Sequence, residues 1–172
     1  GQTEKALETL DTLTRKYEKL ANPDEVAFRR GEILFSAQRY PDAEKAYKAS
    51  LESAGVRSGF RSQSLYKRGW SLFKQGLNEE SLPPFADVLE ATLPEPADAG
   101  RVRPLETLGR ADRELADDTL RVMSIAFSYM EGARSLDPFI ATRGTPAYSH
   151  LLYSRLGDLY VEKQRFQDAA DT

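Results

Sequence analysis

The sequence contains no cysteine and a single histidine, and both scarcities narrow the chemistry open to it. Without cysteine there are no disulfides, no thiolate zinc ligands and no cysteine nucleophile. With His150 alone, the chain cannot form a multi-histidine metal site or a histidine-rich proton relay. A basic excess is also missing, since 24 lysines and arginines stand against 27 acids for a net charge of -3. We therefore expect no nucleic-acid partner, because dedicated nucleic-acid-binding proteins usually carry a basic excess.

Long apolar runs are missing as well. No stretch approaches the roughly 18 apolar residues of a membrane-spanning helix, and no signal peptide is recognisable. The sequence starts at Gly1 and stops within a helical pattern at Thr172, so we expect a segment of a longer protein. Because 40% of the 172 residues are hydrophobic, the chain has enough apolar side chains for a folded core.

The chain does contain a clear helical period. Apolar residues recur three or four positions apart along most of its length, and alternating strand patterns are scarce. Turn signals divide this pattern at Asn22-Pro23-Asp24, at Gln38-Arg39-Tyr40-Pro41 and at Gly76-Leu77-Asn78. We predict an all-α protein in which successive helices pack as antiparallel pairs, because the turns between them are short.

Three segments of the chain share one motif. In residues 27–34, 65–72 and 153–160, an apolar or aromatic residue stands four positions before a glycine and a large apolar residue stands three after it. A turn follows each segment, and then an alanine or serine near an aromatic residue. Residues 120–127 repeat the spacing with Ser124 in place of glycine. This pattern resembles the tetratricopeptide repeat family, whose helix-turn-helix unit has about 34 residues.

The resemblance implies an architecture. One repeat cannot bury its apolar face, whereas a stack of repeats can, so we predict a right-handed superhelical solenoid whose first helices form a concave face. The glycines are expected where paired helices approach closely. The predicted array over 1–172 comprises a half repeat at 4–20, repeats at 24–54 and 60–91, an inserted loop at 93–113, a degenerate repeat at 115–145 and a truncated repeat at 148–172. The inserted loop could cover the concave face, dock a partner or be disordered.

No catalytic motif is recognisable, so we expect no enzyme activity, no cofactor and no metal site. Adjacent carboxylates could serve acid–base or metal chemistry, but acids are also favoured in the first turn of a helix. We accordingly interpret the polar candidates as helix-end or surface residues: Asp117-Asp118 and Glu79-Glu80 as first-turn acids, Asp42 as an acid that opens a helix, Asp137-Pro138 as an N-cap followed by proline, and His150 as a capping or surface histidine.

Ligands of this family contact the first-helix stripe that does not carry the glycine. Projected onto this sequence, the resemblance implies these partner-binding residues: Phe28, Glu32, Phe35, Tyr66, Trp70, Phe73, Lys74, Arg121 and Ile125. The aromatic residues among them could instead pack between repeats. Family members that hold chaperone C-termini need Lys and Asn where Phe28 and Glu32 stand here, so such a partner is not expected.

No acid occurs between Glu52 and Glu79, whereas five basic residues do. This charge pattern suits an acidic peptide or a terminal carboxylate, although a solvated basic face is the alternative. The resemblance implies a non-enzymatic protein-interaction scaffold, similar to bacterial cell-envelope repeat proteins that assemble complexes, with the periplasm or outer membrane favoured over the cytoplasm. The alternative is a structural spacer or self-association arm of a larger protein, including a homodimer formed through the terminal half repeats.

Overall fold

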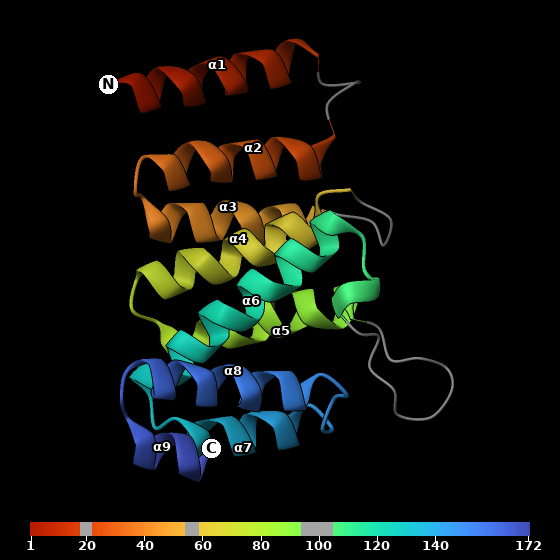
Figure 1. Cartoon of the computed structure of the whole chain (residues 1–172). Helices are drawn as coiled ribbons and strands as arrows, with labels where there is room; N and C mark the ends of the chain where they lie inside the picture. The colour runs from red at the N-terminus through yellow and green to blue at the C-terminus, as the bar shows by residue number, and fades with distance from the viewer. Residues whose placement is uncertain (18–21, 54–58, 94–104) are drawn as a thin grey trace. The chain divides into compact units, whose positions relative to one another are not determined.

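The computed structural model describes residues 1–17, 22–53, 59–93 and 105–172. Within these ranges every regular element is helical, which confirms the predicted all-α class (Figure 1). The helices are α1 (Gln2–Lys16), α2 (Pro23–Ser36), α3 (Tyr40–Ser53), α4 (Arg61–Lys74), α5 (Asn78–Thr92), the 3-10 turn η1 (Leu105–Thr107), α6 (Arg110–Tyr129), α7 (Ala133–Thr142), α8 (Ser149–Glu162) and α9 (Phe166–Asp171).

The helices form two compact units, Gly1–Pro84 and Phe85–Thr172. Helix α5 passes from the first unit into the second, and Pro83 and Pro84 stand inside it at the division. A proline in a helix interior removes one backbone hydrogen bond and crowds the preceding turn. The right-handed superhelix predicted for the whole array stays a prediction.

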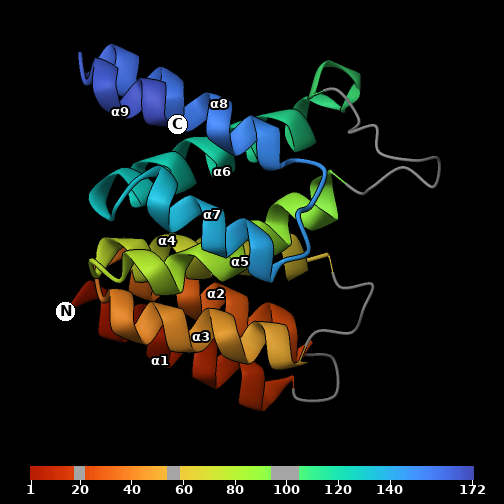
Figure 2. The same ribbon diagram turned by 90° about the horizontal axis from the view of Figure 1, so that it is seen from below.

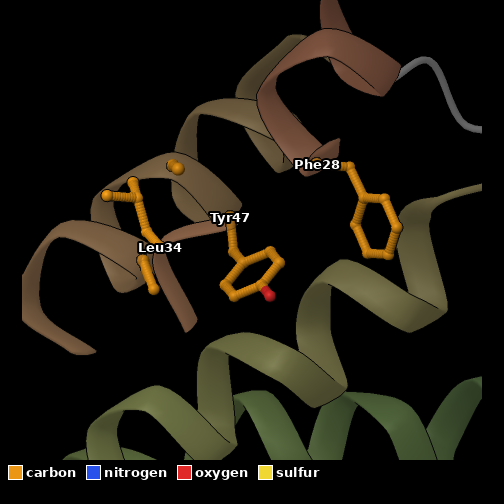
Figure 3. Packing of buried hydrophobic residues seen from close by; sticks show 5 residues of the cluster. Phe28, Leu34 and Tyr47 are labelled. Atoms are coloured by element: carbon orange, nitrogen blue, oxygen red, sulfur yellow. The ribbon is translucent and has the colours of Figure 1, made fainter. Parts of the chain in front are cut away.

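In the first unit, α1 to α4 follow one another in alternating directions (Figure 1). The core cluster is centred on α2 and α3, with Phe28, Leu34 and Tyr47 as its large members (Figure 3). Gly31 permits the close contact of these two helices, because a Cβ atom there would lie 2.5 Å from Cε1 of Tyr47. At this position the expected role of the repeat glycine is present.

Helix α1 packs only partly onto the rest of its unit. It contains no buried residue, and the side chains of Leu13 and Tyr17 are about half exposed, at 51% and 49%. Ion pairs attach it to the rest of the unit, from Arg30 to Asp11 and from Arg39 to Glu4. The predicted homodimer through such apolar edges stays a prediction.

In the second unit, α8 runs in the same direction as α6, whereas α7 runs in the opposite direction (Figures 1 and 2). The core is formed by fully buried side chains on these three helices: Leu120, Met123, Phe127, Leu136, Leu152 and Leu156. The connection between α7 and α8 is tied to the second half of α5. Arg143 there donates hydrogen bonds to Asp87 and Glu90, and the Tyr148 hydroxyl donates to Glu90 at 3.2 Å.

Two of the predicted helix starts are wrong. Asp117 and Asp118 lie in the interior of α6, because that helix already begins at Arg110, where an Arg110–Glu114 ion pair spans one turn. Asp137 and Pro138 lie inside α7, because Gly132, with a φ of 61°, makes the turn that precedes this helix.

Other helix-end predictions are confirmed. Glu79 and Glu80 occupy the first turn of α5, and Asp42 occupies the first turn of α3. Of the predicted inserted loop, residues 94–104 lie outside the described residues. The part from Leu105 onward contains η1 and the beginning of α6.

Candidate partner-binding surfaces

The predicted partner-binding residues divide between the two units, and all except the buried Phe28 lie on two surfaces. Those from Glu32 to Lys74 belong to α2 and α4 of the first unit, and Arg121 and Ile125 belong to α6 of the second. Each surface has its own chemistry and is described by itself.

Phe28 does not lie on a partner-binding surface, so its predicted role is wrong. Its side chain is only 5% exposed, and its ring centroid lies 5.8 Å from that of Tyr47 and 5.2 Å from that of Phe60. A ring held in this way is part of the core and has no surface to offer a partner. Phe28 is buried because Phe60, from the segment before α4, packs over it.

Glu32 and Phe35 are half-buried and connect α2 with its neighbours. The buried Tyr47 hydroxyl donates to Glu32 at 2.5 Å, and the Lys67 ammonium of α4 lies 3.2 Å from the same carboxylate. Burial, reinforced by the contact with Glu32, raises the pKa of Tyr47, so its hydroxyl remains a donor. The Lys67 ammonium also lies 5.0 Å from the ring centroid of Phe35. Lys67 therefore holds together the faces of α2 and α4.

Three rings form a continuous ladder on α4, which we call the aromatic ladder: Tyr66, Trp70 and Phe73. The Trp70 ring meets Tyr66 edge-on at 6.3 Å between centroids and Phe73 edge-on at 5.6 Å. All three side chains are half-buried, whereas Leu65 and Leu72 on another face of α4 are buried in the core. The ladder therefore presents partly exposed rings whose conformations are fixed by mutual contact.

Lys74 lies beside the aromatic ladder. It is exposed, and its ammonium lies 5.7 Å from the Trp70 ring centroid, within the range of a cation–π interaction. The rest of the predicted basic flank is partly neutralised, because Arg68 pairs with Glu44 at 2.7 Å and Lys67 pairs with Glu32. The sequence pattern could not show these pairs, since the acids come from α2 and α3.

The second surface is a groove between the parallel helices α6 and α8, which we call the α6–α8 groove. Its volume is about 290 Å³, and its lining comprises Arg121, Ser124, Ile125, Arg155, Asp158, Leu159 and Glu162. Arg121 and Ile125 of the predicted set both line this groove, whereas the residues that α8 supplies are absent from that set. Arg121 pairs with Asp118, and Arg155 pairs with Asp117 across the two helices.

The described residues contain no cluster of three or more metal-ligating side chains. Of the helices in these ranges, none combines the length and the apolar character that crossing a membrane requires. His150 is exposed at the start of α8, and its Nδ1 lies 2.9 Å from the carbonyl oxygen of Ala147. This position confirms the interpretation of His150 as a surface histidine at a helix end.

Among known families, the tetratricopeptide repeat model matches residues 1–57 of the chain. Residues 1–57 belong to the tetratricopeptide repeat family. The matched part contains α1, α2 and α3, together with Gly31 and Tyr47. No curated protein matches the chain.

A solved structure titled "MamA RS-1 ArsTM double mutant" resembles the chain with a TM-score of 0.55. The sequence identity is 20%, and the match covers 98% of this chain and 80% of that chain. At this identity the likeness concerns the fold alone. Taken together, the tetratricopeptide repeat match and the helical fold support a protein-interaction scaffold in general terms. Such repeats typically bind other proteins and do not typically catalyse reactions.

Proposed function

We propose that this tetratricopeptide repeat protein is a non-enzymatic scaffold that binds a protein or peptide segment on the α2 and α4 face of its first unit. The aromatic ladder carries the proposal. Partly exposed aromatic rings on a rigid helix lose little conformational entropy when a partner covers them, and tryptophan and tyrosine dominate the binding energy of many interfaces.

The surroundings of the ladder suggest the chemistry of the partner. Lys74 is exposed beside Trp70, and Lys67 lies between Phe35 and Glu32. A segment with an apolar side chain for the rings and a carboxylate for Lys74 would satisfy both features. Glu32 and Glu44 already neutralise two of the basic residues, Lys67 and Arg68. The proposed partner segment therefore combines apolar and acidic side chains and is not a long acidic stretch.

Assembly of a bacterial envelope complex is the cellular role we propose, and the family resemblance supports it. The competing proposal is a spacer or self-association arm, which the exposed apolar side chains of Leu13 and Tyr17 on α1 favour. The two proposals differ in what a substitution on α4 does to binding.

The test compares wild type with Trp70→Ala and Phe73→Ala as baits for lysate and isolated envelope fractions. We expect each substitution to weaken partner retention by roughly tenfold or more, as for an interface anchor, with an unchanged circular dichroism spectrum. Phe166→Ala is the matched control, since its ring is 65% exposed and lies on α9 of the other unit.

Equal retention by wild type and both α4 variants would contradict the proposal and favour the spacer. Loss of partners with Phe166→Ala, but not with Trp70→Ala, would move the binding surface to the second unit. The fraction that supplies the retained partner would support or contradict the envelope role.

A further inference from the structure

We propose that the α6–α8 groove is a second docking surface, which binds an arginine side chain presented by a partner protein. The inference concerns the second unit alone and does not depend on the aromatic ladder. Three features carry it: an apolar floor, two acids that have no partner among the described residues, and an exposed aromatic ring one turn along α6 from the groove residue Ile125.

The floor of the groove accommodates the stem of a long side chain. Ile125 of α6 and Leu159 of α8 are both half-buried, so each shows apolar surface to the opening. The volume of about 290 Å³ suits one extended side chain rather than a folded element. Arginine and lysine both place methylene stems along such a surface while the charged group reaches polar partners.

The charges of the groove select a cation. Arg121 and Arg155 are the two cations in its lining, and each is already paired, with Asp118 and Asp117. Among the described residues, Asp158 and Glu162 have neither an ion pair nor a hydrogen bond, although both line the same opening. They stand four positions apart on α8 and hence share one face. These two carboxylates would repel an acidic ligand, whereas a cation would form ion pairs with them.

Tyr129 extends the surface toward the C-terminal end of α6. It lies one turn beyond Ile125, and its side chain is 64% exposed. The ammonium of Lys163, the residue after Glu162, lies 5.8 Å from its ring centroid. The ring thus already faces a cation of its own chain, which the side chain of a partner would join or replace.

This combination favours guanidinium over ammonium. A guanidinium group donates hydrogen bonds in a planar fork to carboxylates and stacks on aromatic rings, whereas an ammonium group acts as a compact, strongly hydrated charge. The two carboxylates together with the exposed ring therefore fit arginine better than lysine.

The test selects peptides from a random phage-displayed library on the whole chain. The baits are wild type, the double variant Asp158→Asn/Glu162→Gln, and the control Asp112→Asn/Glu131→Gln. The control removes two exposed acids of the same unit that do not line the groove. We expect arginine to be enriched on wild type and on the control, but not on the groove variant.

Fluorescence anisotropy then measures one enriched peptide and two versions in which lysine or glutamine replaces arginine. We expect the groove variant to weaken the arginine peptide by about tenfold or more, as for lost charge-assisted hydrogen bonds. The lysine version should bind more weakly than the arginine peptide. Added salt should weaken binding to wild type, because the groove is exposed.

Absence of arginine enrichment on wild type, or equal enrichment on the groove variant, would overturn the proposal. A library run on Trp70→Ala separates the two surfaces. Arginine enrichment that persists on Trp70→Ala assigns it to the α6–α8 groove, and enrichment that disappears there assigns it to the aromatic ladder and overturns the inference.

Discussion

At the scale of single residues, two glycines that occupy equivalent places in the repeat motif have different surroundings. A Cβ at Gly31 would lie 2.5, 2.7 and 2.8 Å from three ring atoms of Tyr47, a fully buried ring whose hydroxyl is held by Glu32. A Cβ at Gly157 would meet nothing within 4 Å. The sequence motif marks both positions, but only the packed structure separates a required glycine from a tolerated one.

We expect Gly31→Ala to lower the free energy of unfolding by about 1–3 kcal/mol, because the Tyr47 ring must move within a packed core. Gly157→Ala should raise it by up to about 1 kcal/mol, since alanine restricts the unfolded chain and nothing opposes it in α8. Urea unfolding followed by circular dichroism measures both. Equal or greater stability of Gly31→Ala would show that the α2–α3 contact is not tight at this point.

The candidate site shows the same limit of sequence reasoning. Phe28 and Trp70 stand on comparable stripes of their helices, yet Phe28 is buried and Trp70 is half exposed. The difference arises from Phe60 and Tyr47, which close over Phe28 from other segments. Helical spacing assigns a residue to a stripe, whereas its burial depends on partners that are distant in sequence.

At the scale of elements, the helical period predicts most of the observed helices, but it does not predict all of the residues at which they begin and end. Short acidic or proline-containing motifs resemble helix starts wherever they stand. Pro138 lies inside α7 and Asp117 lies inside α6, so these local signals were outweighed by packing of the helices around Leu136 and Leu120. Where turn residues cut the period sharply, as at Gly76, the predicted boundary agrees closely with α4 and α5.

The prolines of α5 provide a test at this scale. Pro83 is exposed within the helix, so its ring contributes little packing while it removes a backbone hydrogen bond. We expect Pro83→Ala to raise the free energy of unfolding by about 1 kcal/mol or more, within the helix penalty of proline relative to alanine.

Thermal and urea unfolding provide the measurement, and the control is Pro41→Ala, which replaces an exposed proline in the first turn of α3. A first-turn proline costs no such bond, so Pro41→Ala should change stability less. A less stable Pro83→Ala would mean that the proline contributes to folding at the division of the two units.

At the scale of the whole molecule, the charged groups were the least predictable part. The sequence shows a basic stretch on α4, but Glu44 and Glu32 from other helices neutralise much of it. It also shows Asp158 and Glu162 without indicating that the nearby arginines are already paired. Composition and period predict the all-α class, whereas the net charge of a surface emerges only when the helices are packed.

Each unit also contains a buried tyrosine whose hydroxyl donates to a glutamate, Tyr47 to Glu32 and Tyr148 to Glu90. Burial is the main cause that raises the pKa of both tyrosines above the ordinary value of 10.0, and the neighbouring glutamates add to it. A raised pKa in the folded state stabilises the protein fully below about pH 10, and this contribution disappears as the pH rises above that value.

We therefore expect the free energy of unfolding to fall steeply above about pH 10 in both units. Urea unfolding of wild type and of Tyr47→Phe/Tyr148→Phe, from about pH 8 to about pH 11, measures the effect. The double variant should start less stable, because it lacks two hydrogen bonds, and should then lose less stability as the pH rises. Parallel losses in the two proteins would assign the alkaline effect to lysines of the surface ion pairs. In that case the two buried hydroxyls would contribute nothing that depends on pH.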